Sequence, residues 1–152
     1  MTLRNDAECI IKNALHAAQP DTAVKKALKQ ADFGTGRLVL VAAGKAGWQM
    51  AKAAVDVLGD RLSGGVVITK YEHSKGPLKG MEIFEAGHPV PDENSYRATQ
   101  AAIDAVTGLS SEDTVLFLLS GGGSALFEKP LIPTKDMEQL TRELLASGAD
   151  IV

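Results

Sequence analysis

Three short runs of apolar residues constrain the fold of this chain more than any other feature. They lie at residues 38–42, 65–69 and 115–119, and the first reads Leu-Val-Leu-Val-Ala. An uninterrupted apolar run of this length is typical of a strand that is covered on both faces, as in a parallel sheet. A shorter strand is expected at residues 81–85.

The segments between these runs carry apolar residues at helical spacing. They predict helices at residues 47–58 and 93–106, a last helix from Thr134 to Gly148, and two helices before the first strand. Strands that alternate with helices predict an α/β fold. We therefore expect a Rossmann-like, three-layer α/β/α arrangement around a mostly parallel sheet.

Two units are expected along the chain. Residues 1–36 form an N-terminal helical segment, and residues 37–152 form the Rossmann-like α/β domain. The connection between strands 65–69 and 81–85 is too short for a crossover helix, so the pairing of the latter strand stays open.

Composition excludes several classes of protein. The 152 residues carry a net charge of −3, which gives no electrostatic reason to expect nucleic acid as a partner. Cys9 is the single cysteine, so an internal disulfide is excluded. No apolar run approaches the ~18–20 residues of a membrane span, and the first residues lack the pattern of a signal peptide. We expect a cytoplasmic protein without a membrane partner.

Four loops follow the carboxyl ends of the predicted strands. They are Gly44–Gly47, Lys70–His73, Gly87–Asp92 and Ser120–Ser124. Ligands of open parallel sheets bind beyond these strand ends. If the strands run parallel, the four loops converge on one rim of the sheet.

The loop after the last strand is the most specific local feature. Its residues are Ser120, Gly121, Gly122, Gly123 and Ser124. Consecutive glycines let the backbone approach a ligand and turn successive N–H groups toward one anion. The alternative is a tight turn or a flexible loop, and we favour a phosphate or carboxylate site.

Lys45 and His88 are the chemically active residues of two other loops. Lys45 follows Gly44 at a helix N-terminus, where a lysine can neutralise charge on a transferring phosphoryl group. His88 can bind a substrate hydroxyl or carboxylate, or serve as an acid–base group. A solvated lysine and a histidine that anchors its own loop are the alternatives. No metal-ligand cluster is visible in the sequence.

Known nucleotide-binding motifs do not match. A P-loop requires glycine where Val39 stands and serine or threonine where Ala46 stands. The dinucleotide fingerprint fails because Gly44-x-x-Gly47 lacks its third glycine, although Glu72 keeps a nicotinamide cofactor under consideration.

Together these motifs resemble the glycerate 2-kinase family, whose members have also been labelled hydroxypyruvate reductases. The resemblance rests on residues 43–47, 68–73, 85–92 and 119–126, and their order and spacing match over nearly the whole chain. Gly-His-Pro-Val-Pro-Asp and Ser-Gly-Gly-Gly-Ser are the most specific parts of these segments.

The resemblance implies phosphorylation of D-glycerate at its 2-hydroxyl by ATP with Mg²⁺. It implies that Lys45 is catalytic, that Gly44 and the glycine–serine loop bind phosphate or substrate, and that His88 lines the same cleft. Family members are longer, with a C-terminal domain that supplies an arginine, so we expect this chain to carry half of an active site. Two alternatives stay open, an NAD(P)H-dependent hydroxypyruvate reductase and a non-catalytic sugar-phosphate-binding domain, and so does assembly into a homo-oligomer.

Overall fold

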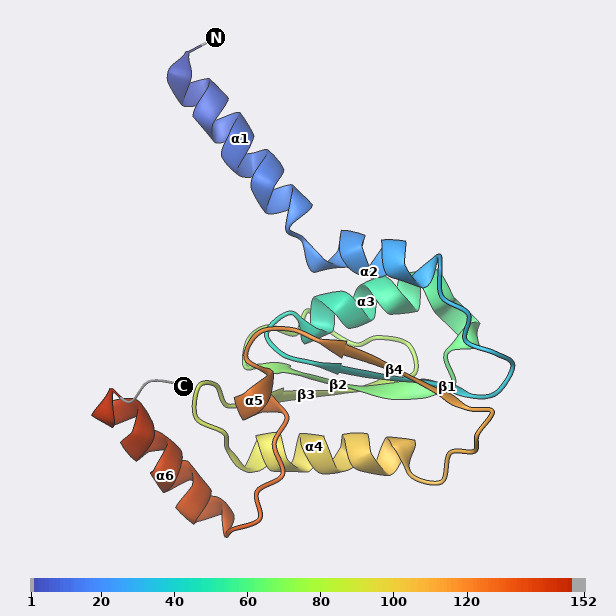
Figure 1. Ribbon diagram of the computed structural model, residues 1–152, viewed down its shortest axis with the longest axis vertical. Helices are drawn as coiled ribbons and strands as arrows, with labels where there is room; N and C mark the ends of the chain where they lie inside the picture. The colour runs from blue at the N-terminus through green and yellow to red at the C-terminus, as the bar shows by residue number, and fades with distance from the viewer. Residues whose placement is uncertain (1, 149–152) are drawn as a thin grey trace.

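The computed structural model describes residues 2–148, and its centre is a four-stranded, all-parallel sheet (Figure 1). Residue 1 and residues 149–152, the end of the predicted α/β domain, lie outside the described residues. The strand order is β3-β2-β1-β4. The strands are β1 (Leu38–Ala43), β2 (Gly64–Lys70), β3 (Met81–Ala86) and β4 (Thr114–Leu119).

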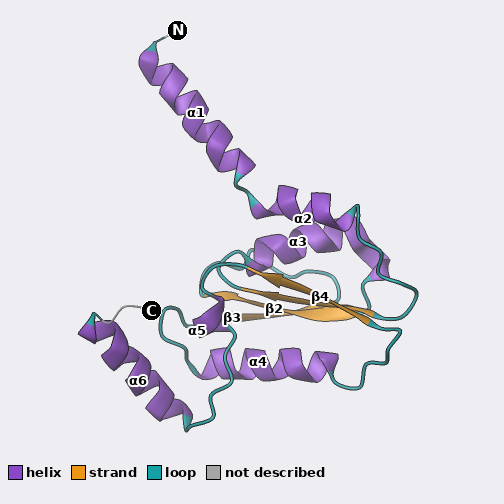
Figure 2. Ribbon diagram, viewed as in Figure 1, coloured by secondary structure: helices purple, strands orange, loops and turns teal. Residues whose placement is uncertain are grey.

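Helices cover both faces of the sheet, which confirms the three-layer α/β/α prediction (Figure 2). On one side α3 packs on the sheet and α2 packs on α3, and on the other side α4 packs on β2 and β3. The helices are α1 (Leu3–Ala17), α2 (Pro20–Leu28), α3 (Gly47–Leu58), α4 (Glu93–Val106), α5 (Gly123–Leu126) and α6 (Thr134–Ser147), with a 3-10 turn, η1 (Gly59–Arg61).

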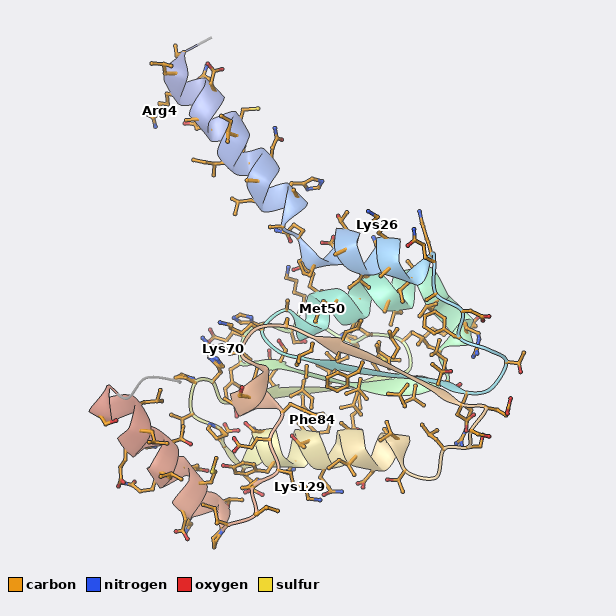
Figure 3. All side chains as sticks on the ribbon, viewed as in Figure 1. Arg4, Lys26, Met50, Lys70, Phe84 and Lys129 are labelled. Atoms are coloured by element: carbon orange, nitrogen blue, oxygen red, sulfur yellow. The ribbon has the colours of Figure 1, made fainter. Side chains whose placement is uncertain are left out.

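Alternate residues of β1 feed two separate cores, which is why the whole strand is apolar. Leu40 and Ala42 belong to the core under α2 and α3, whereas Val41 and Ala43 belong to the core over α4. All six residues of β1 are buried. Met50 and Phe84 mark the two cores on opposite sides of the sheet (Figure 3).

The pairing that the sequence left open is parallel. β3 pairs with β2 in register Val67↔Ile83, and a loop without a helix makes the crossover. β3 is thereby an edge strand, and the loop from Tyr71 to Gly80 returns along the α3 side of the sheet.

The prediction of a buried last strand is wrong for β4. Val115, Phe117 and Leu119 are 42%, 44% and 61% exposed, because β4 is the other edge strand and α4 lies under β2 and β3 instead. The sequence pattern could not show this, since an edge strand with one uncovered face can be as apolar as a central one.

The N-terminal segment is not uniform. α2 contributes Val24 and Leu28 to the core beneath α3, whereas α1 extends away from the sheet without a buried residue (Figure 1). The boundary near residue 36 therefore stays a prediction. Among the described residues, no helix has the length and apolar character needed to cross a membrane.

Gly65 provides a test of the β1–β2 pairing. A Cβ atom at this position would overlap the carbonyl oxygen of Leu40 on β1, which is backbone and cannot rotate away. Gly65→Ala should lower the free energy of unfolding by about 3 kcal/mol, measured by chemical denaturation. The control, Gly80→Ala, has φ +74° and no atom within 4 Å of the new Cβ. It should cost about 1 kcal/mol, from backbone strain alone. Equal losses would contradict the close approach.

Candidate active site

The carboxyl ends of all four strands lie at one edge of the sheet, because every pairing is parallel. The four predicted loops therefore meet on one rim, at the left of Figure 1, as expected. This edge is where open α/β sheets bind ligands.

Backbone hydrogen bonds join the loops after β1 and β4. The Ser120 amide donates to Ala43 O over 2.9 Å and the Lys45 amide donates to Gly121 O over 2.9 Å. The Ala46 amide donates to Ser120 Oγ over 3.0 Å. Gly44 has φ +116°, and a Cβ there would overlap Ser120. Ser120 thus positions the two loops with its own hydroxyl.

The glycine–serine loop brings Lys45 and His88 together. Gly122 has the left-handed φ of +86° and is the N-cap of α5. A Cβ there would lie 2.9 Å from His88 Nε2 and 3.2 Å from Lys45 Cγ. Both side chains therefore border the same glycine, which leaves no room for another residue type.

A hollow of about 540 Å³ opens beside this loop. Its walls combine the apolar Phe117, Leu119 and Phe127 with the whole stretch from Ser120 to Ser124. Ser124 and Gly121 are exposed, whereas Ser120 is half-buried. The short helix α5, which the sequence did not predict, begins within this stretch.

The surroundings of His88 are electropositive. Burial lowers the pKa of its imidazole below the ordinary 6.5, and the charges of Lys45 and Lys70 lower it further, followed by His73. Lys70 ends β2 at the same rim (Figure 3). A neutral ring among cations can accept a hydrogen bond while its neighbours attract an anion.

The carboxylate of Asp92, which follows His88 in the same loop, is already engaged. Asp92 caps α4 by accepting from the Ser95 amide over 3.0 Å, and it accepts from Tyr71 Oη over 2.7 Å. Burial acts to raise the pKa of Asp92, but hydrogen bonds from Tyr71, Ser95 and Gly87 outweigh it and lower this pKa. Asp92, the N-cap of α4, thus braces the loop that carries His88.

His73 is a residue that the sequence reasoning undervalued. The sequence alone assigns it no role of its own, yet its Nδ1 lies 2.9 Å from the carbonyl oxygen of Lys45. The contact spans 28 positions of sequence, so local patterns could not reveal it. The resemblance to known motifs at residues 68–73 was the one available signal.

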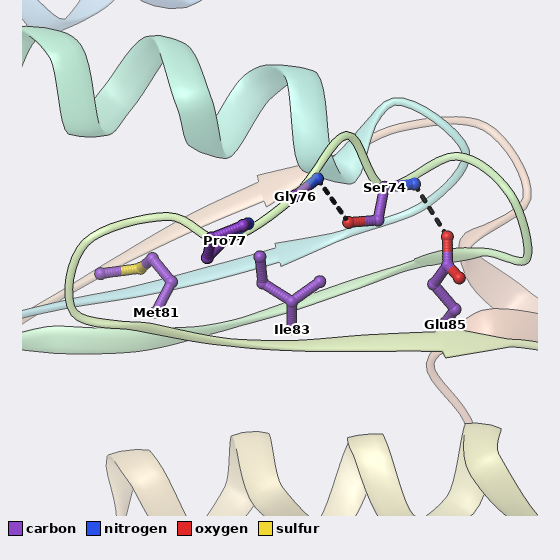
Figure 4. Close-up of a pocket in the computed structure, with 6 residues that line it drawn as sticks. All are labelled: Ser74, Gly76, Pro77, Met81, Ile83 and Glu85. Atoms are coloured by element: carbon purple, nitrogen blue, oxygen red, sulfur yellow. Dashed lines mark hydrogen bonds between the residues drawn. The ribbon is translucent and has the colours of Figure 1, made fainter.

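A second hollow, of about 440 Å³, lies under the β2–β3 loop and away from the glycine loop (Figure 4). Ser74, Gly76, Pro77, Met81, Ile83 and Glu85 line it. Within it the Ser74 amide donates to Glu85 Oε1 over 2.8 Å. Its residues hold the loop in place and contain no cation, so we assign the chemistry to the first hollow.

The described residues contain no dedicated cage for a metal ion. Across residues 2–148 no group of three or more His, Cys, Asp or Glu side chains could hold a metal. Mg²⁺ is usually bound through one or two carboxylates together with substrate phosphates. The rim loops contain the carboxylates of Glu72 and Asp92 beside their cations, and Asp92 accepts from Tyr71 and Ser95.

Fold and site together define a parallel α/β protein in which a lysine and a histidine border a glycine loop at the carboxyl ends of the strands. The chain belongs to the family described as "Domain of unknown function (DUF4147)", whose model matches residues 6–152.

Individual relatives of the chain carry more specific names than the family does. The chain is 52% identical to D-glycerate 2-kinase of Thermotoga maritima over 93% of its length, and 37% identical to glycerate 2-kinase of Pyrococcus horikoshii over 99%. It is also 41% identical to a putative hydroxypyruvate reductase of Agrobacterium vitis. The chain spans 34%, 36% and 32% of these relatives, about a third of their length.

Solved structures agree with this grouping. A crystal structure of glycerate kinase from Thermotoga maritima matches with a TM-score of 0.87 at 51% identity, covering 98% of this chain and 36% of the other. A Pyrococcus horikoshii protein matches with a TM-score of 0.84 at 37% identity, covering 99% of this chain and 37% of the other. The parallel sheet and its rim are thus shared with a glycerate kinase.

The electrostatics of the rim can be measured directly. Lys45→Met removes one charge that lowers the pKa of His88, so this pKa should rise toward 6.5 but stay below it, since burial remains. An NMR titration of the His88 ring protons measures the change. Lys52→Met is the control, because Lys52 lies on α3, the helix that follows Lys45, and is paired with Asp56. An unchanged or lower pKa in Lys45→Met would contradict the arrangement.

Proposed function

We propose that this chain contributes the phosphate- and substrate-binding half of a kinase that transfers the γ-phosphoryl group of ATP to the 2-hydroxyl of D-glycerate. The observation that carries the proposal is the convergence of Lys45 and His88 on Gly122. The names of the relatives supply the substrate and the reaction. Since the chain spans about a third of those relatives, the activity is that of the complete gene product.

Phosphoryl transfer depends mainly on positioning and on stabilisation of charge. In the proposed reaction the glycerate 2-hydroxyl oxygen forms the new bond to phosphorus as its proton passes to His88, and ADP leaves with the electrons of the broken bond. The Lys45 ammonium neutralises charge on the transferring group. His88, whose lowered pKa keeps the ring neutral at pH 7, accepts a hydrogen bond from the substrate hydroxyl.

The glycine–serine loop is the proposed anion cradle. Gly121, Gly122 and Gly123 leave the backbone open beside Lys45, and the hydroxyls of Ser120 and Ser124 lie at the two ends. Gly44 is part of the cradle because only a residue without Cβ fits against Ser120. The loop can hold a phosphate or the glycerate carboxylate with the same donors.

ATP and Mg²⁺ are the proposed co-substrate and metal. Bound Mg²⁺ would neutralise charge on the phosphates, and no group of three or more ligand side chains within residues 2–148 could hold it without them. We therefore route no step through the metal. A kinase that draws on ATP is proposed to work in the cytoplasm.

Hydroxypyruvate reduction is the second candidate, because one relative bears that name. A reductase needs a site for a nicotinamide dinucleotide. Here Gly47 approaches the Ile68 carbonyl so closely that a Cβ would lie 2.7 Å from it. The glycine is thereby explained by the contact between α3 and β2, and the dinucleotide fingerprint is incomplete.

The first test is the activity of the complete gene product with D-glycerate and ATP-Mg²⁺, and separately with hydroxypyruvate and NADH. We expect 2-phosphoglycerate as the product, with kcat lowered roughly 100- to 1000-fold in Lys45→Ala because transition-state charge is left unneutralised. Lys52→Ala, which changes an exposed lysine of α3, the helix that follows Lys45, should behave as wild type.

Other outcomes have distinct meanings. NADH oxidation without phosphoryl transfer would replace the kinase by the reductase. Formation of 3-phosphoglycerate would keep the kinase and change the hydroxyl. Full kinase activity in Lys45→Ala would remove Lys45 from the mechanism.

Gly122→Ala tests the cradle. The new methyl group would press on His88 and Lys45, so we expect kcat/KM for D-glycerate to fall at least about 100-fold, as for other misplaced reacting groups. Gly108→Ala is the matched control, since Gly108 has φ +72° and nothing within 4 Å of the new Cβ. It should lose stability but keep its activity. Equal losses of activity would show that backbone strain, rather than crowding of the two side chains, is responsible.

A further inference from the structure

The peptide groups on both sides of Lys45 are held in place. Its amide donates to Gly121 O over 2.9 Å, and the next amide, that of Ala46, donates to Ser120 Oγ. Its carbonyl oxygen lies 2.9 Å from His73 Nδ1 and accepts from Thr69 Oγ1 over 3.4 Å. The direction in which the Lys45 side chain leaves the backbone therefore depends on two neighbouring strands.

The contact with His73 fixes the proton on one ring nitrogen. A backbone carbonyl only accepts, so Nδ1 must donate to Lys45 O. The role of the ring is thus assigned to Nδ1. The side-chain NH2 group of an asparagine can take the place of Nδ1–H, whereas that of a glutamine lies one carbon further from the backbone and cannot.

The position of His73 is not needed for packing. Its side chain is exposed, whereas Thr69 on β2 is fully buried. An exposed side chain with a hydrogen bond to a distant backbone group contributes little to stability, because water competes for both partners. Thermal stability should therefore change little when the ring is removed.

The loop that carries His73 is itself anchored. The Ser74 amide donates to Glu85 Oε1 over 2.8 Å (Figure 4), and Trp48 Nε1 donates to Gly76 O over 2.8 Å. The His73 amide donates to Lys70 O over 3.0 Å. These bonds connect the loop to β3 and to α3, so the ring has a fixed base from which to hold the Lys45 carbonyl.

We propose that His73 is a positioning residue: its Nδ1–H holds the Lys45 carbonyl and thereby sets the aim of the Lys45 ammonium at the anion cradle. This inference rests on the proposed kinase function. Because Lys45 is proposed to act on the transition state, a misaimed Lys45 should lower kcat more than it changes KM.

The test compares His73→Ala, His73→Gln and His73→Asn in the complete gene product. Alanine and glutamine should lower kcat roughly 10- to 100-fold while KM for ATP and D-glycerate stays within about twofold. Asparagine should restore most of kcat. His16→Ala, at an exposed histidine of α1, is the control and should equal wild type.

Hydrogen exchange followed by mass spectrometry gives a readout independent of activity. In the alanine and glutamine variants, peptides that span residues 43–49 should exchange at least about tenfold faster, whereas the asparagine variant should match wild type. Activity retained by the glutamine variant but lost in the asparagine variant would overturn the proposal in favour of a role for Nε2. Equal kcat and equal exchange in wild type and all three variants would overturn it by showing that His73 has no positioning role. If wild type has no kinase activity, the proposed function fails, and the exchange series alone decides whether His73 holds Lys45.

Discussion

The join between the ends of β1 and β4 is the constraint on which the site depends. Parallel pairing places Ala43 beside Leu119, and the ladder continues past the strands through the Ser120 and Lys45 amides. These hydrogen bonds can form only because Gly44 has no side chain at the point where Ser120 passes it. Each later feature, from the aim of Lys45 to the position of Gly122, follows from this contact between two loops that are 74 positions apart.

The sheet and most of its helices could be predicted because local patterns encode them. β1 supplies both cores, so each of its residues must be apolar, and the run at 38–42 is visible without any tertiary information. The cap of α4 is equally local, since Asp92 and Ser95 bond reciprocally within one turn. The prediction that β4 is buried on both faces was wrong, because the burial of a strand also depends on which strands α4 covers.

Prediction of the site was limited in the same way. Glycines and serines at residues 120–124 indicate an anion loop by type alone, and Lys45 stands out at a strand–helix junction. The contact of His73 with the Lys45 carbonyl depends on how the β2–β3 loop folds back over the sheet. That path is set by Glu85 and Trp48, residues that no motif links to histidine.

The distribution of charge at the rim argues for an anionic ligand independently of any relative. Lys45, Lys70 and His73 all lower the pKa of His88, so they act on one region of space. Among residues 2–148 no carboxylate forms an ion pair with Lys45 or Lys70. Asp92 is held by Tyr71 and Ser95, and Glu85 by the Ser74 amide. Two lysines without a carboxylate partner can therefore pair with the charge of a bound phosphate or carboxylate. The same lysines lower the pKa of His88, which keeps its ring able to accept a hydrogen bond beside that ligand.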